Sequence, residues 1–154
     1  MRIIPILLVL GATVGCVRTS RNPATGRVDV DVESPTKTGE DWRGEVKGIG
    51  AMMQLSGTAK AEVSNGVTAA SMSLTGARAG GSHPWHIHLG RCGSGGPIVG
   101  DPNLYPPLVI GDNGSGAASA RLQLQLDEAK EYYVNVHASM SEMENIVACG
   151  QIDD

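Results

Sequence analysis

The chain of 154 residues contains no phenylalanine, and aromatic residues make up only 3% of it. It also lacks long runs of Leu, Ala, Glu and Lys with a 3.6-residue period, which argues against a helical bundle. The basic residues are scattered and are outnumbered by acidic ones, 12 to 16. Nucleic-acid binding is therefore not indicated, because phosphate contacts need a clustered basic surface. The length suits a single domain.

The first 16 residues have the pattern of a secretory signal peptide. Arg2 precedes an apolar run from Ile3 to Leu10, too short to span a bilayer, and small residues follow. The closing TVGC resembles the bacterial lipobox, in which Cys16 would be lipidated, although Thr13 stands where that pattern prefers leucine. We expect an exported, periplasmic lipoprotein that meets the membrane only through this anchor. Ordinary cleavage near Cys16 and a buried N-terminal strand are the alternatives.

Residues 17–45 mix Thr, Ser, Pro and charged residues with little periodicity. This composition predicts a flexible tether in front of a domain at 46–154. The segment RVDVDV within it is a candidate edge strand.

From about Gly48 onward, short alternating segments are separated by Gly, Asn and Asp. Asn65-Gly66 between two such segments is a strong hairpin signal. In ASARLQLQL small or apolar residues alternate with polar ones, so that they point to opposite faces of a strand. About seven to eight strands separated by such turn residues predict an all-β fold, an antiparallel β-sandwich or flattened barrel.

Two cysteines remain besides Cys16, namely Cys92 and Cys149. In an exported domain such a pair is expected to form a disulfide bond. Free thiols or metal ligands are the alternative.

Three of the four histidines, His83, His86 and His88, lie in HPWHIHLGRC, and His137 lies in YYVNVHAS. Alternate residues of a strand share a face, so His86 and His88 project together, and His137 shares its face with Tyr133 and Asn135. If the two strands are close, three imidazoles converge. Imidazole suits copper, zinc, iron and nickel, and the absence of nearby carboxylates disfavours calcium and magnesium. The alternative is that these histidines are structural.

Four segments, HPWHIHLGRCGSGG, PPLVIGDNGSGAA, YYVNVHAS and IVACGQI, resemble the copper/zinc superoxide dismutase family in the same order. The likeness covers about residues 50 to 154, and Pro84 replaces the glycine of the family's His-Gly-aromatic-His-x-His strand. The resemblance implies a Greek-key β-sandwich, one copper ion per chain and superoxide as substrate. It assigns copper ligation to His86, His88 and His137.

The resemblance also implies roles for residues around the metal. Cys92 and Cys149 would form the intrasubunit disulfide. His83 would be a structural histidine that hydrogen-bonds to the backbone without touching the metal.

The chain departs from the family in ways that bear on activity. No histidine lies between Cys92 and His137, so the histidine that bridges copper to zinc is missing and no zinc site is expected. Ile146 stands where the family has the arginine that docks superoxide. Glu142 and Glu144 would repel an anion, and Arg91 is a candidate substitute for the missing cation.

Two methionines follow His137 closely in the chain. Met140 and Met143 carry soft thioether groups, which select Cu(I). Capping of the core under a short loop is the simpler interpretation of both side chains.

Three functions fit these residues. The first is a copper-dependent superoxide dismutase without zinc. The second is a non-enzymatic periplasmic copper protein, for storage, delivery or protection, whose partner would be a copper donor or acceptor. The third is a structural β-sandwich with relic histidines. The third includes a weaker resemblance to CHRD domains, which VNVHAS and CGQI fit well.

Overall fold

The computed structural model describes residues 17–21, 28–32 and 40–154 of the chain. The chain divides into two compact units, residues 1–37 and 38–154. In the first unit β1 (Val17–Arg21) pairs antiparallel with β2 (Val28–Val32), so the VDVDV part of the candidate edge strand does form a strand. The predicted signal peptide and Cys16 lie outside the described residues. Within the described part, no helix is long and apolar enough to cross a bilayer.

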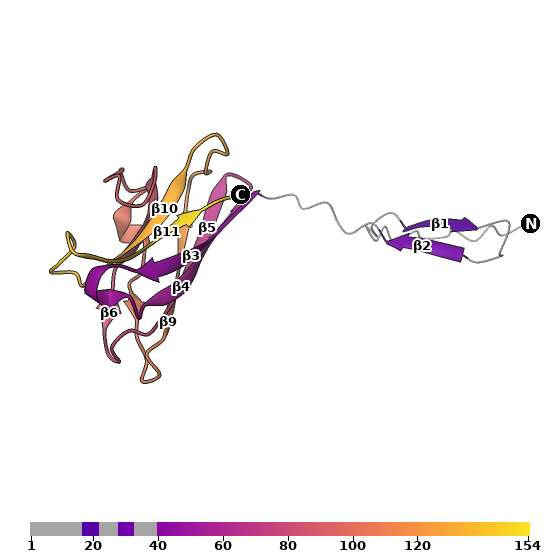
Figure 1. The fold of residues 1–154 in the computed structure, drawn as a ribbon. Coiled ribbons are helices and arrows are strands. Elements are labelled where there is room, and N and C mark those ends of the chain that lie inside the picture. The colour runs from indigo at the N-terminus through magenta and orange to yellow at the C-terminus, as the bar shows by residue number, and fades with distance from the viewer. Residues whose placement is uncertain (1–16, 22–27, 33–39) are drawn as a thin grey trace, which may run out of the picture. The chain divides into compact units, whose positions relative to one another are not determined.

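The second unit is a seven-stranded antiparallel sheet that curls round a core (Figure 1). The strand order across the sheet is β7-β10-β11-β3-β4-β5-β9. In chain order the strands are β3 (Glu40–Gly48), β4 (Ser56–Ser64), β5 (Val67–Thr75), β7 (Trp85–Leu89), β9 (Gly116–Leu122), β10 (Tyr132–His137) and β11 (Ile146–Ile152). The prediction of an all-β, antiparallel sandwich or barrel is confirmed.

Shorter elements complete the unit. A two-stranded sheet joins β6 (Ser82–His83) to β8 (Leu108–Val109). The 3-10 helices η1 (Gly50–Met52) and η2 (Pro102–Leu104) lie in connections between strands.

The folded unit begins earlier than the predicted boundary at residue 46. β3 starts at Glu40, and Trp42 is buried in the core, edge-on to the ring of Tyr132. Gly44 lies so close to β11 that an added Cβ would stand 1.8 Å from the Gln151 carbonyl oxygen. Glycine is required there for the strands to approach, and it interrupts the alternation by which a strand is recognised.

The predicted hairpin joins β4 to β5. Asn65 and Gly66 both have positive φ, 51° and 81°, as a two-residue type I′ turn requires. Along β5, buried and more exposed side chains alternate, as expected of a strand with one face on the core. β9 ends at Leu122, before the alternating pattern of its sequence does.

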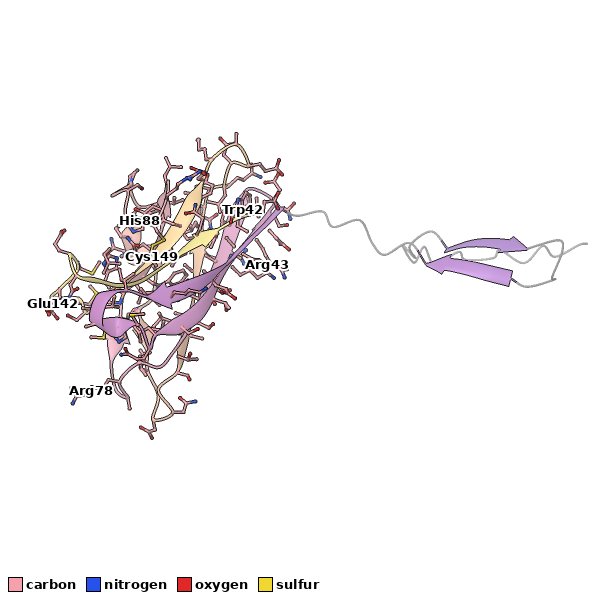
Figure 2. The ribbon with its side chains drawn as sticks, viewed as in Figure 1. Trp42, Arg43, Arg78, His88, Glu142 and Cys149 are labelled. Carbon is pink, nitrogen blue, oxygen red and sulfur yellow. A yellow bond between two sulfur atoms is a disulfide. The ribbon has the colours of Figure 1, made fainter. Side chains whose placement is uncertain are left out.

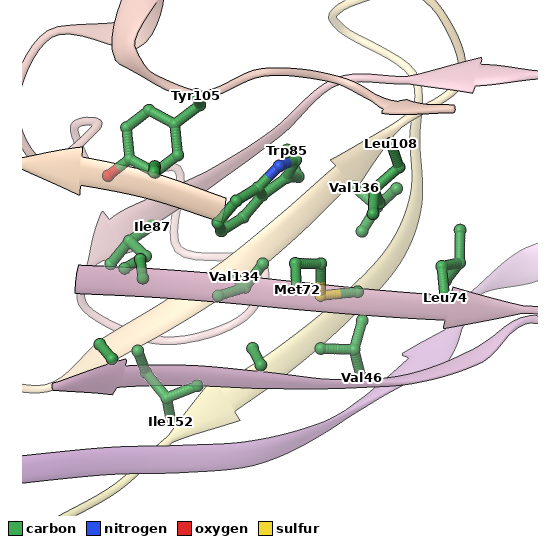
Figure 3. Close-up of a cluster of buried hydrophobic side chains, with 14 of the residues drawn as sticks. Val46, Met72, Leu74, Trp85, Ile87, Tyr105, Leu108, Val134, Val136 and Ile152 are labelled. Carbon is green, nitrogen blue, oxygen red and sulfur yellow. The ribbon is translucent and has the colours of Figure 1, made fainter. Parts of the chain in front are cut away.

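The core lies on the concave side of the sheet. Trp85 and Ile87 of β7 project to the same side as Val134 and Val136 of β10 (Figure 3), and all four are almost fully buried. The opposite faces of these two strands are buried as well. That second buried face carries the histidines.

Candidate metal centre

Three histidines from two paired strands form the only group of His, Cys, Asp or Glu in the described part of the chain that could hold a metal ion. The β7–β10 register places His86 opposite Asn135 and His88 opposite Tyr133. The His137 backbone N–H donates to the Pro84 carbonyl, which continues this pairing.

The histidine side chains form a compact, buried cluster. One ring nitrogen from each of His86, His88 and His137 lies within 4.8 Å of the other two. Their exposed fractions are only 4%, 8% and 5%. The structure thus brings together the three histidines that were predicted from the sequence as metal ligands.

Backbone carbonyls set the tautomers of two of the rings. Nδ1 of His88 lies 2.8 Å from the Gly96 carbonyl oxygen, and Nδ1 of His137 lies 2.5 Å from that of Met143. A carbonyl oxygen can only accept a hydrogen bond, so both Nδ1 atoms carry the proton. In the neutral rings Nε2 therefore keeps its lone pair, which is how histidine ligands of metals are generally oriented.

The three candidate donor atoms follow from these contacts. His86 Nδ1 lies 3.3 Å from His137 Nε2, so these two nitrogens face each other. His88 Nε2 is buried, and it has no hydrogen-bond partner among the described residues. Because a buried polar atom without a partner is unfavourable, the unpaired nitrogen indicates a place for a ligand. The donor set fits a metal that prefers imidazole nitrogen.

Burial keeps the three imidazoles uncharged. It lowers the pKa of His86 to about 4, with the neighbouring His137 and His88 adding to the effect. Burial also lowers the pKa of His88 and of His137. At neutral pH all three rings are in the form that binds metals without first losing a proton.

The fourth histidine supports the cluster from outside. His83 on β6 donates a hydrogen bond from Nδ1 to the His137 carbonyl oxygen, 3.0 Å away. This is a backbone contact of the kind expected for a structural histidine.

The two methionines differ in their relation to the cluster. Met143 contacts His137 through its backbone carbonyl. Met140 is 69% exposed in the turn that follows His137. A role for either thioether remains a prediction.

Aromatic side chains hold the histidine rings. Tyr133 stacks on His88 with ring centroids 5.0 Å apart, and its hydroxyl accepts a hydrogen bond from the Gly96 N–H. Tyr105 packs edge-on against His86 and donates to the Val99 carbonyl. Strand alternation predicted Tyr133 on the histidine face, whereas Tyr105 and Gly96 lie in loop segments for which no such pattern exists.

The predicted disulfide between Cys92 and Cys149 is present, with the two Cα atoms 6.0 Å apart. Cys149 lies on β11 (Figure 2), and Cys92 lies in the 90–99 loop that follows β7. This loop also carries Gly96. The bridge therefore ties the segment that orients His88 to the sheet.

Neither Arg91 nor Glu144 supplies a free cation at the cluster. Arg91, the candidate cation, donates from Nε to both carboxylate oxygens of Glu131, 2.9 and 2.8 Å away, at the surface. Burial lowers the pKa of His137, and the negative charge of Glu144 partly opposes this shift by raising it. Ile146, which the sequence resemblance aligns with a superoxide-docking arginine, pairs with His137 in the sheet.

Comparison of the chain with models of known protein families and with curated proteins finds no match.

Proposed function

We propose that the protein binds one copper ion through His86, His88 and His137. The observation that carries the proposal is the unpaired, buried Nε2 of His88, which faces a cluster with two further imidazole nitrogens. His86 would contribute Nδ1, and the other two rings would contribute Nε2. Copper would supply the capacity for a one-electron redox change.

The donor set favours copper over other metals. Three neutral imidazoles without a carboxylate are poor ligands for calcium and magnesium. Among divalent first-row metals, nitrogen sites bind Cu²⁺ most tightly. The sequence resemblance to copper/zinc superoxide dismutases supports the same choice, and the missing histidines argue against a second, zinc site.

We favour copper handling over catalysis. Negative charge near the site would slow the approach of superoxide, and Arg91 is engaged by Glu131. An exported copper protein would instead exchange its ion with a donor or acceptor, at the membrane if Cys16 is lipidated. Superoxide dismutation is the second candidate, supported by the likeness of the histidine pattern to that family.

The deciding experiment measures copper binding and superoxide decay on one preparation of the chain from residue 17 onward. Cu(I) and Cu(II) affinities are measured by competition with chelators, with zinc and nickel as competitors. His86→Ala and His137→Ala should each abolish stoichiometric binding. Thr58→Ala, on the outer face of the sheet, serves as the control that retains it.

The outcomes separate the candidate functions. One tightly bound copper ion per chain without superoxide decay beyond that of free copper supports copper handling. Decay well above free copper, lost in both histidine variants, would establish the dismutase. No copper binding by the folded protein would leave the histidines structural and overturn the proposal.

A further inference from the structure

A pocket of about 300 Å³ opens beside the histidine cluster. Tyr133 and Asn135 of β10 line it together with Ile146 and Cys149 of β11. Ile49 and two glycines of the 90–99 loop complete its wall. The pocket thus lies next to the face that carries the histidines, between the disulfide and the segment before η1.

Asn135 is the polar side chain of this face that the metal proposal does not use. It lies opposite His86 on one side and opposite Cys149 on the other, and only 6% of it is exposed. Its side chain makes no hydrogen bond to any described residue. Among the described residues, only His88 Nε2 is a fully buried side-chain N or O atom without a partner. The amide atoms of Asn135 are also unpaired but are not fully buried, and Asn135 lines the pocket, so its amide is open to the pocket.

The chemistry of the wall restricts the occupant. A side-chain amide offers two donors and one acceptor, and buried amides are normally hydrogen-bonded. None of the residues that line the pocket carries an ionisable group apart from the Tyr133 hydroxyl, which already accepts from Gly96. An anion would lose its hydration there without gaining a cation as partner, which is unfavourable.

We infer that this pocket binds a small, uncharged molecule with hydrogen-bonding groups, held by the side-chain amide of Asn135. The site is formed by the fold and does not depend on a bound metal. Its wall shares β10 with His137, so an occupant would lie beside the histidines.

A pair of probes of equal shape tests the inference. Acetamide is neutral and matches the amide, whereas acetate is an anion of nearly the same size. Each is titrated into the full chain in its metal-free form, and the NMR signals of the Asn135 side-chain amide and of Gly93 and Gly95 are followed. Acetamide should produce saturable shifts at these groups, with an apparent affinity at least about tenfold higher than that of acetate.

Two variants locate the interaction. Asn135→Leu keeps the branched shape of the side chain and removes its hydrogen-bonding groups, so it should lose the acetamide response. Gln123→Leu removes an exposed amide elsewhere and should leave the response unchanged. If Asn135→Leu does not fold, the contrast between the two probes on the unmodified chain still decides the question.

Acetate binding as tight as acetamide, or acetamide shifts that avoid these residues, would overturn the inference. Because the measurement uses metal-free protein, its failure is distinguishable from failure to bind copper.

Discussion

The two ends of the sheet differ in how they use their outer faces. On β4 and β5 the outer face meets solvent and carries small polar contacts, such as the 2.9 Å hydrogen bond between Thr58 and Ser73. On β10 every residue is buried, and β7 is buried over most of its length. Four of the five buried polar residues in the described part, His86, His88, Asn135 and His137, lie on these two strands.

Covering a sheet face with loops creates a second interior. Polar side chains placed there lose water, and they must find partners or remain available to a ligand. The 90–99 loop and the turn after His137 provide such partners through the carbonyls of Gly96 and Met143. The open end of the sheet has no comparable requirement, since water satisfies its side chains.

The largest expected loss of stability comes from removing the disulfide that ties the 90–99 loop to the sheet. The double variant Cys92→Ser, Cys149→Ser removes a bridge between residues 57 positions apart. On the chain-entropy model this lowers the free energy of unfolding by about 4 kcal/mol. Urea denaturation against the oxidised protein measures the change. A loss below about 1 kcal/mol would mean that the loop is held mainly by its other contacts.

Acid should destabilise the protein through the histidines of the covered end. The pKa of His86 is lowered from 6.5 to about 4 in the folded protein. Between these values the unfolded chain binds a proton at His86 that the folded chain does not. The contribution of His86 to the free energy of unfolding is therefore fully present above about pH 6.5, and it is lost as the pH drops toward 4. His86 alone corresponds to about 3 kcal/mol over this window.

Urea midpoints of the metal-free protein, measured from pH 7.5 to pH 4, check this effect. His86→Leu should flatten the curve, and Thr58→Ala should leave its slope unchanged. An equally steep fall in His86→Leu would assign the acid sensitivity to other groups.

Tyr133→Phe tests one hydrogen bond of the covered end. The variant keeps the ring on His88 but removes the acceptor of the Gly96 N–H. We expect a loss of about 1 kcal/mol in stability. If the copper proposal holds, copper affinity should also fall by about tenfold, because Gly96 orients His88.

Tyr132→Phe is the matched control for this prediction. The Tyr132 hydroxyl accepts a 2.9 Å hydrogen bond from the Asp127 N–H, and no metal-site contact depends on it. It should show a similar loss in urea denaturation with copper affinity unchanged. Equal effects of the two variants on copper affinity would contradict a specific role for Tyr133.

The smallest loss of stability is expected on the solvent-exposed outer face of β4 and β5. Thr58→Ala removes the exposed hydrogen bond to Ser73, and we expect less than about 0.5 kcal/mol. Thermal unfolding measures it. A larger loss would show that the outer face is organised more tightly than its exposure indicates.

The features that depend on local periodicity could be predicted from the amino-acid sequence. The alternation of His86 and His88 placed both on one face of a strand, and Asn65-Gly66 defined a hairpin through the positive φ angles it allows. The cysteine pair was predictable because few cysteines offer few pairings. The start of β3 was missed, since Gly44 breaks the alternation where two strands come into close contact.

The assembly of the site depends on contacts between segments that are distant in the chain. The strand order brings β10 beside β7, although more than forty residues separate them in the chain. The carbonyls of Gly96 and Met143 select the imidazole tautomers, and Asn135 is left facing a pocket. These contacts come from irregular loops, whose backbone groups carry no periodic signal. Their positions are set by packing over distances that no local pattern encodes.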